Sequence, residues 1–400
     1  MSNHETKINY TKKDLPKSFL TFGLPLLLIG IVAAFFAYQL DPVRASFNNI
    51  ISLLLIVSVG MGAIFLVALE HIAGAVWSVP FRRIAEHQGF IFLATPLLAL
   101  PIILNMHDIF EWTHLEVVMN DPILYQKSPY LNTEFFLARS IGIFLLMSFF
   151  LFVYLRNSTK QDTTHSQKTT KINALISAPF MVFFAISITM VAIDYAMSLE
   201  PHWFSTIFGV YYFAGTFATA MAVLTLITLK LKSNGNLLKE INGNHYYSMG
   251  GLMFAFTAFW MYMAFSQYML IWYANVPEET FWFLPRMKNG WEYLSIALIF
   301  IKFIIPFGLL LNRNSKMNPS RLKLAAFWII GAHIYDMYWL VMPTYNRMSG
   351  TEGPVFGWIE LGFVSLSAGI ILVFYYFAAN KKNHIPIGDP KLNRALDFHI

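Results

Sequence analysis

The sequence has 400 residues, of which 56% are hydrophobic and only 12% are charged, and its mean hydropathy is +0.53. This composition excludes a soluble globular protein of the same size. The formal net charge of +6 does not indicate nucleic-acid binding, because the basic residues are spread over short segments between apolar runs. The absence of cysteine excludes disulfides, thiolate-ligated iron–sulfur clusters and CxxCH haem attachment.

Apolar runs of about 20 residues, the length that crosses a bilayer as a helix, recur along the whole chain. They predict an all-α polytopic membrane protein with ten transmembrane helices. The expected spans are Phe19–Leu40, Ile51–Trp77, Phe90–Met106, Phe135–Tyr154, Asn173–Met197, Phe204–Leu231, Met249–Tyr273, Glu292–Leu311, Leu322–Met342 and Val355–Phe377.

The basic residues predict the orientation of these spans. Of the 28 Lys and Arg residues, 21 fall on the side of the termini, among them Lys7, Lys12, Arg82 and Arg83. Five fall in the opposite loops and two lie within spans. By the positive-inside rule both termini are cytoplasmic. We therefore expect a tail at residues 1–18, one membrane domain at 19–380 and a second tail at 381–400.

Several connecting segments carry their own signals. The turn after Asp194 is short, so the spans on either side should be antiparallel neighbours, with Trp203 as an interfacial anchor. The polar stretch Asn157–Lys171 is typical of a flexible linker. The outer loops His107–Thr133 and Ala274–Gly290 are rich in apolar and aromatic residues, so we expect them at the interface or under a partner protein.

Charged groups inside spans are costly and need a reason, which makes them candidates for proton handling. Glu70 and His71 lie near the inner end of the second span and diverge by about 100° on a helix. They are candidates for a proton path. Alternatively, the helix projects beyond the bilayer and both groups reach the headgroups.

A second set of candidates lies at the outer side. His107 ends the third span, and Glu134 and Arg139 open the fourth. A histidine and a carboxylate at one mouth suit a reaction that releases protons, such as quinol oxidation. Alternatively, Arg139 simply pairs with Glu134. Asp194, about one turn from the outer end of the fifth span, is either a proton-path residue or interfacial.

The second half of the chain holds the most central charge. Lys302 lies about eleven residues into the eighth span, where it needs a carboxylate partner or a lowered pKa. His333 and Asp336, three residues apart, share one face of the ninth span and form either a relay or a satisfied pair. Because His71 and His333 lie at different depths, no histidine pair suits haem b. The chain is thus expected to bind neither a cofactor of its own nor a metal.

Four stretches of sequence resemble the ActF family, the ten-helix membrane subunits of bacterial alternative complex III, which are related to the NrfD and polysulfide-reductase membrane subunits. The stretches are EHIAGAVWSVPFRRIAE (70–86), HDIFEWTH (107–114), DYAMSLEPHWFSTIFGVYYFAG (194–215) and FSQYMLIWYANVPEET (265–280). The resemblance covers nearly the whole chain.

The resemblance implies a fold in which helices 2–5 and 6–9 form two four-helix bundles, with helices 1 and 10 peripheral. It implies a subunit of a quinol or menaquinol oxidoreductase in the bacterial inner membrane. Implied partners are an ActC-like sister subunit, an iron–sulfur subunit, multihaem c-type cytochromes and a terminal oxidase. It also implies proton half-channels, and it places Glu134 at the carboxylate position and His107 at the histidine position of the sister subunit's quinol site.

Two other function classes fit the same composition. A secondary transporter would show interrupted helices at matched places in two halves, but Pro179 and Pro306 do not match. A membrane scaffold would have every buried charge satisfied within the chain. Purification separates these classes, because a complex subunit brings c-type haem with it and a transporter does not.

Overall fold

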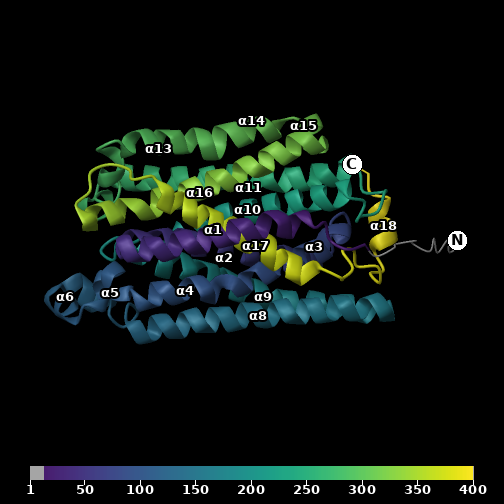
Figure 1. The fold of residues 1–400 in the computed structure, drawn as a ribbon, viewed down its shortest axis with the longest axis horizontal. Helices are drawn as coiled ribbons and strands as arrows, with labels where there is room; N and C mark the ends of the chain where they lie inside the picture. The colour runs from purple at the N-terminus through teal and green to yellow at the C-terminus, as the bar shows by residue number, and fades with distance from the viewer. Residues whose placement is uncertain (1–12, 400) are drawn as a thin grey trace, which may run out of the picture.

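The computed structural model describes residues 13–399, so the tail with Lys7 and Lys12 lies outside the described residues. The described part is helical and has no strand. Ten helical stretches are long and apolar enough to cross a membrane, which confirms an all-α multi-pass protein. Figure 1 shows them running along one common direction, with the ends of the described part of the chain and α18 at the same end.

The spanning stretches contain twelve α-helices and two irregular segments. They are α1 (Ser18–Leu40), α2 (Pro42–Ala73), α3 (Val79–Gly89) with η1 (Phe90–Ala94) and α4 (Thr95–Leu104), α8 (Thr133–Thr164), α9 (Gln167–Tyr195), α10 (Phe208–Ser233), α11 (Gly243–Ala274), α13 (Trp291–Ile299) with η5 (Phe300–Ile304) and α14 (Ile305–Leu311), α16 (Pro319–Ser349) and α17 (Trp358–Ala379).

Short helices occupy the connections between spans. They are α5 (Met106–Ile109), η2 (Glu111–Thr113), α6 (Leu115–Asn120), α7 (Pro122–Lys127), η3 (Met197–Leu199), α12 (Pro277–Thr280), η4 (Leu284–Met287), α15 (Arg313–Met317) and α18 (Leu392–Leu396). The predicted outer loops 107–133 and 274–290 are thus largely helical.

Helix α2 is the centre of the fold. It is hydrophobic all round, and 94% of its most apolar stretch is buried. It packs against α3, α4, α9, α10, α16 and α17, which belong to both halves of the chain. In Figure 1, α8 and α9 lie along one edge of the molecule and α13 to α15 along the opposite edge. This arrangement agrees with two helical bundles that meet at α2 and α10.

Helix α2 begins earlier than the predicted span, which started at Ile51. Asp41 accepts a hydrogen bond from the backbone N–H of Arg44 at 2.9 Å, and Pro42 occupies the first helical position. A capping aspartate followed by proline is a typical helix start. The polar residues after it were expected in a loop, but they belong to the helix.

The segment Asn157–Lys171 is not a flexible linker, so that prediction was wrong. Helix α8 continues to Thr164 and α9 begins at Gln167. The polar side chains that suggested a loop are bonded across this corner: the Gln161 amide donates to the carbonyl of Ser166 at 3.0 Å and to Thr170 Oγ1 at 2.8 Å.

The turn after Asp194 joins antiparallel neighbours, α9 and α10, as predicted. Trp203, however, is not an interfacial anchor. It is only 1% exposed and stacks on Trp282 with ring centroids 4.4 Å apart. A tryptophan between two spans is typical of the membrane surface, but Trp203 packs in the interior between two connecting segments.

Helices α1 and α17 pack side by side through glycine. A Cβ atom on Gly30 would lie 2.4 Å from the Cα of Leu366, and one on Gly369 would lie 2.4 Å from the backbone nitrogen of Leu27. Backbone atoms cannot move aside as a flexible side chain can. The two helices can therefore approach this closely only because both positions lack a side chain.

We expect Gly30→Leu to separate α1 from α17 and to destabilise the protein by at least about 1–3 kcal/mol, the usual cost of overpacking. The matched control is Gly331→Leu on α16, because no heavy atom lies within 4 Å of a Cβ placed there. The thermal unfolding midpoint of the purified protein in detergent checks this. Equal midpoints for the two variants would contradict the close α1–α17 contact.

Candidate functional site

A buried network of charged side chains lies where the second half of the chain packs against α2. Lys302 on η5 forms an ion pair with Asp336 on α16 and donates a hydrogen bond of 3.0 Å to Nδ1 of His333. All three side chains are at most 7% exposed. The sequence predicted that Lys302 needs a carboxylate partner or a lowered pKa, and that His333 and Asp336 share a face. The structure brings all three together.

The network continues to the central helix through His333. An ammonium group can only donate, so Nδ1 of His333 accepts from Lys302 and Nε2 of the neutral ring carries the proton. Nε2 lies 3.0 Å from the hydroxyl of Ser58. Ser58 donates to the hydroxyl of Tyr212 at 3.1 Å, which donates to the carbonyl of Leu54 at 2.7 Å. The hydrogen bonds thus run in one direction from the lysine to α2.

Local backbone features position Lys302. Pro306 has no N–H to donate to the carbonyl four residues earlier, which is that of Lys302, and its ring crowds that carbonyl. The helix widens here into the π-helical segment η5. Opposite, a Cβ on Gly215 would lie 3.0 Å from the Lys302 ammonium and 3.0 Å from the His333 ring. Glycine at this position leaves room for the charged pair.

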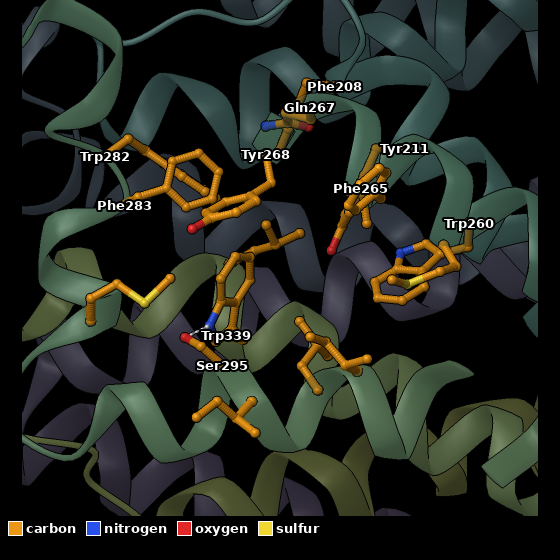
Figure 2. A pocket seen from close by; sticks show the side chains of 17 residues that line it. Phe208, Tyr211, Trp260, Phe265, Gln267, Tyr268, Trp282, Phe283, Ser295 and Trp339 are labelled. Carbon is orange, nitrogen blue, oxygen red and sulfur yellow. Dashed lines mark hydrogen bonds between the residues drawn. The ribbon is translucent and has the colours of Figure 1, made fainter. Parts of the chain in front are cut away.

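An aromatic cavity of 270 Å³ adjoins the network. Figure 2 shows its side chains converging from α10, α11, α13, α16 and the 281–287 connection. Tyr211 belongs to both features, because it lines the cavity and donates a hydrogen bond to Asp336. The Trp260 ring also lines the cavity, and the Lys302 ammonium lies 4.8 Å from its centroid. A ligand in the cavity would thus contact the proton-bearing groups through Tyr211.

The cavity wall holds few polar atoms, and they are fixed. The indole N–H of Trp339 donates to the hydroxyl of Ser295 at 2.8 Å, the dashed contact in Figure 2. Gln267 is 5% exposed and lines the cavity. Its amide oxygen has no hydrogen-bond partner among the described residues. This oxygen is therefore available to a donor on a ligand.

A buried cation supports one side of the cavity from behind. Arg286 donates to the carbonyls of Trp282 at 2.6 Å and Leu340 at 2.7 Å, and its guanidinium lies 3.4 Å from the Trp282 ring centroid. Burial lowers the pKa of Arg286 to about 9, an effect that the nearby Glu200 partly offsets. The group stays charged at neutral pH and fixes Trp282 by a cation–π contact.

The outer-side candidates are not brought together. His107 and Glu134 are exposed, and among the described residues no hydrogen bond joins either of them to Arg139. Arg139 instead forms a bidentate ion pair with Asp194, with both contacts at 2.9 Å. Of the alternatives that the sequence left open, the pairing of Arg139 with Glu134 does not occur, and Asp194 is not interfacial because it is 1% exposed. Helix rotation, which the sequence does not reveal, turns Glu134 outward.

The Arg139–Asp194 pair is closed by further contacts. Arg139 Nη1 donates to the carbonyl of Tyr130 at 2.8 Å, and the guanidinium lies 3.8 Å from the Tyr130 ring centroid and 4.4 Å from that of Phe135. Buried charges require such saturation. With its donors and both ring contacts committed, this arginine has little left to offer a ligand.

Glu70 and His71 are buried at the end of the molecule where the described termini lie. Their side chains therefore do not reach the lipid headgroups. Both are at most 6% exposed. His71 stacks on Tyr154 and lies 3.3 Å from the amide of Asn173. Glu70 forms no ion pair within the described chain. A buried carboxylate that forms no ion pair is a candidate for proton handling, and the proton-path role of Glu70 stays a prediction.

The sequence missed the residues around Glu70. Arg82 and Arg83 were counted as loop charges, but both are at most 3% exposed on α3. Arg82 pairs with Asp389 of the C-terminal tail, and Arg83 pairs with Glu86 at 3.0 Å. The i, i+3 spacing of Arg83 and Glu86 was the signal that could have revealed an ion pair.

Helix α3 also places a polar side chain close to the central network. The Gln88 amide donates to the carbonyls of Val59 at 3.2 Å and Ala220 at 2.9 Å, next to Ser58. Ser58 and Glu70 lie on the same helix, roughly 18 Å apart along its axis. Polar groups therefore occur at the depth of Ser58, at the depth of Glu70 and over part of the distance between them. Among residues 13–399 no cluster of three or more His, Asp or Glu side chains could hold a metal ion.

Comparison with known proteins adds no family to this geometry. No protein-family model matches the sequence, and no curated protein matches it. The resemblance to the ActF family therefore rests on the motifs in the sequence.

Proposed function

We propose that this chain is a membrane subunit of a quinol-oxidising respiratory complex of the alternative complex III type, and that it helps to move protons. The observation that carries the proposal is the buried Lys302–His333–Asp336 network, which contacts an aromatic cavity through Tyr211. Ten spans and the ActF-like motifs agree with it.

The network has the chemistry of a proton relay. Charges inside a membrane protein are costly, at least about 2.5 kcal/mol for a central charge, and usually mark ion or proton pathways. The two nitrogens of His333 face different partners, Lys302 and Ser58, so a proton taken at one nitrogen can leave from the other. Tyr211 at the cavity supplies the entrance and Ser58 at α2 the exit.

The cavity suits the ring of a quinol. Flat aromatic walls stack on a planar ring, and the amide oxygen of Gln267 can accept from a ring hydroxyl. Oxidation of a quinol to a quinone releases two protons and two electrons. Tyr211 and Asp336 receive the protons in turn, and the electrons leave to iron–sulfur and c-type haem groups in partner subunits.

The proposal includes partners and a location. Exposed apolar side chains on α6 and α7, such as Leu115 and Tyr125, suit a covering protein such as an extrinsic redox subunit. An ActC-like sister subunit and a terminal oxidase complete the assembly. The resemblance to the ActF family implies the bacterial inner membrane, and the distribution of Lys and Arg favours a cytoplasmic position for both termini.

A secondary transporter is the second candidate, and one observation favours it. Helical interruptions occur at η1 in the third span and at η5 in the eighth span. These are corresponding spans if the chain is divided into two sets of five. Transporter sites are often built from discontinuous helices at matched places. Of these two interruptions only η5 carries a charged side chain, that of Lys302, which weakens the match.

Gentle detergent extraction of the tagged chain from its native membrane distinguishes the two. We expect it to elute with a c-type cytochrome and an iron–sulfur subunit, because this cysteine-free chain needs partners to carry electrons. The measurement is the reduced-minus-oxidised haem spectrum together with mass spectrometry of the subunits. Elution of the chain alone and without haem would contradict the proposal and favour the transporter.

A further inference from the structure

A second cavity, of 660 Å³, lies between α1, α10 and α16 at the end of the bundle that holds the termini. Its volume falls within the range of about 300–1,000 Å³ that is usual for ligand sites. It lies outside the charged network and the aromatic cavity, and shares no lining residue with the latter. It has no role in the proposed electron or proton chemistry.

The cavity is polar toward the helix ends and apolar toward the membrane interior. On α16, Lys323 comes one turn before Phe327, and on α1, Ser18 comes one turn before Phe22. One turn is about 5.4 Å along a helix. The walls therefore pair a charged or hydroxyl group at the end of each helix with an aromatic ring one turn deeper. This is the polarity of a lipid, with a headgroup above and chains below.

The polar end carries a net positive charge. Lys230, Lys232 and Lys323 line it, and none of the described lining residues is acidic. Lys232 donates to the carbonyls of Leu238 and Lys239. Lys230 and Lys323 are exposed, and neither forms an ion pair with a carboxylate in the described chain. Their charges are thus available to an anion.

We propose that this cavity binds an anionic phospholipid. The phosphate group lies against Lys230 and Lys323, and the acyl chains lie along Phe22, Phe327 and Leu372. Basic pockets between transmembrane helices are typical sites for anionic headgroups. The apolar walls distinguish this occupant from a free phosphate ion, which would leave them bare. The absence of acidic side chains among the described lining residues distinguishes it from a zwitterionic lipid.

The test uses the full chain purified in detergent, with native mass spectrometry to measure lipid retention. Phosphatidylglycerol is compared with phosphatidylcholine of the same acyl chains, with inorganic phosphate as competitor. The variant is Lys230→Gln with Lys323→Gln. The matched control is Lys168→Gln with Lys171→Gln, two exposed lysines of α9 outside the cavity.

We expect the native chain to retain phosphatidylglycerol in preference to phosphatidylcholine. The cavity variant should bind it roughly 25-fold more weakly, about fivefold for each lysine, and the control should not change. Unchanged phosphatidylcholine binding by the variant shows that the fold is intact. Equal retention of the two lipids by the native chain, no loss in the variant, or full displacement by inorganic phosphate would each overturn the proposal.

Discussion

Lys302→Met is expected to destabilise the protein by about 3–5 kcal/mol, because it leaves the carboxylate of Asp336 buried without its cation. Asp336→Leu should cost a similar amount for the converse reason. The thermal or denaturant midpoint of the purified protein in detergent measures both. These are among the largest single-substitution effects that we expect in this chain.

The double variant Lys302→Met with Asp336→Leu is the decisive partner of this pair. It removes both charges, so we expect it to recover most of the stability lost in either single variant. If the losses simply add, the two residues do not interact, and the network described here is wrong. A folded double variant also provides a protein in which the function of the network can be tested.

Arg139→Met should be destabilising to a similar degree, about 3–5 kcal/mol, because Asp194 would lose a bidentate partner in a buried site. The substitution also removes the hydrogen bond to Tyr130 and its cation–π contact. The same unfolding measurement applies. Arg139→Met combined with Asp194→Asn should cost less stability than the sum of the two single substitutions.

The matched control for Arg139 is an exposed pair at the end of the protein opposite the described termini. Arg347 lies 3.4 Å from Glu111, with side chains 41% and 34% exposed. Glu111→Gln should therefore change stability by only about 0–1 kcal/mol. Similar effects of Arg139→Met and Glu111→Gln would show that the buried pair is not specially stabilising.

The number of spans could be predicted from the sequence, but their ends could not. Apolar runs of about 20 residues are a strong signal, because an exposed backbone is not tolerated in lipid. The predicted helix ends were wrong where polar side chains form hydrogen bonds within the folded chain. The residues after Asp41 and those of 157–164 look like loops, yet they belong to helices because capping and cross-corner hydrogen bonds accommodate them.

Part of the central site could also be predicted. Lys302 was found because a charge in a span is costly, and His333 with Asp336 because of their spacing. Tyr211 and Ser58 were missed, since a single hydroxyl in an apolar helix gives no periodic signal. Their roles depend on how α2, α10 and α16 are rotated toward one another, which only the folded chain shows.

The sequence could not show whether His107, Glu134 and Arg139 come together, for the same reason. His107, Glu134 and Arg139 share a depth, but depth alone does not place side chains on one face. The apolar residues of helix α8 are not concentrated on one face, so its sequence does not indicate which face is buried. The structure turns Arg139 inward to Asp194 and leaves Glu134 outside.

The measurement that tests the central claim most directly is proton movement per electron. Vesicles containing the whole complex would carry either the native chain or the Lys302→Met, Asp336→Leu double variant, with Glu111→Gln as control. We predict that the double variant assembles normally and moves fewer protons per electron than the native and control proteins. An unchanged ratio at normal assembly would show that the buried network is purely structural.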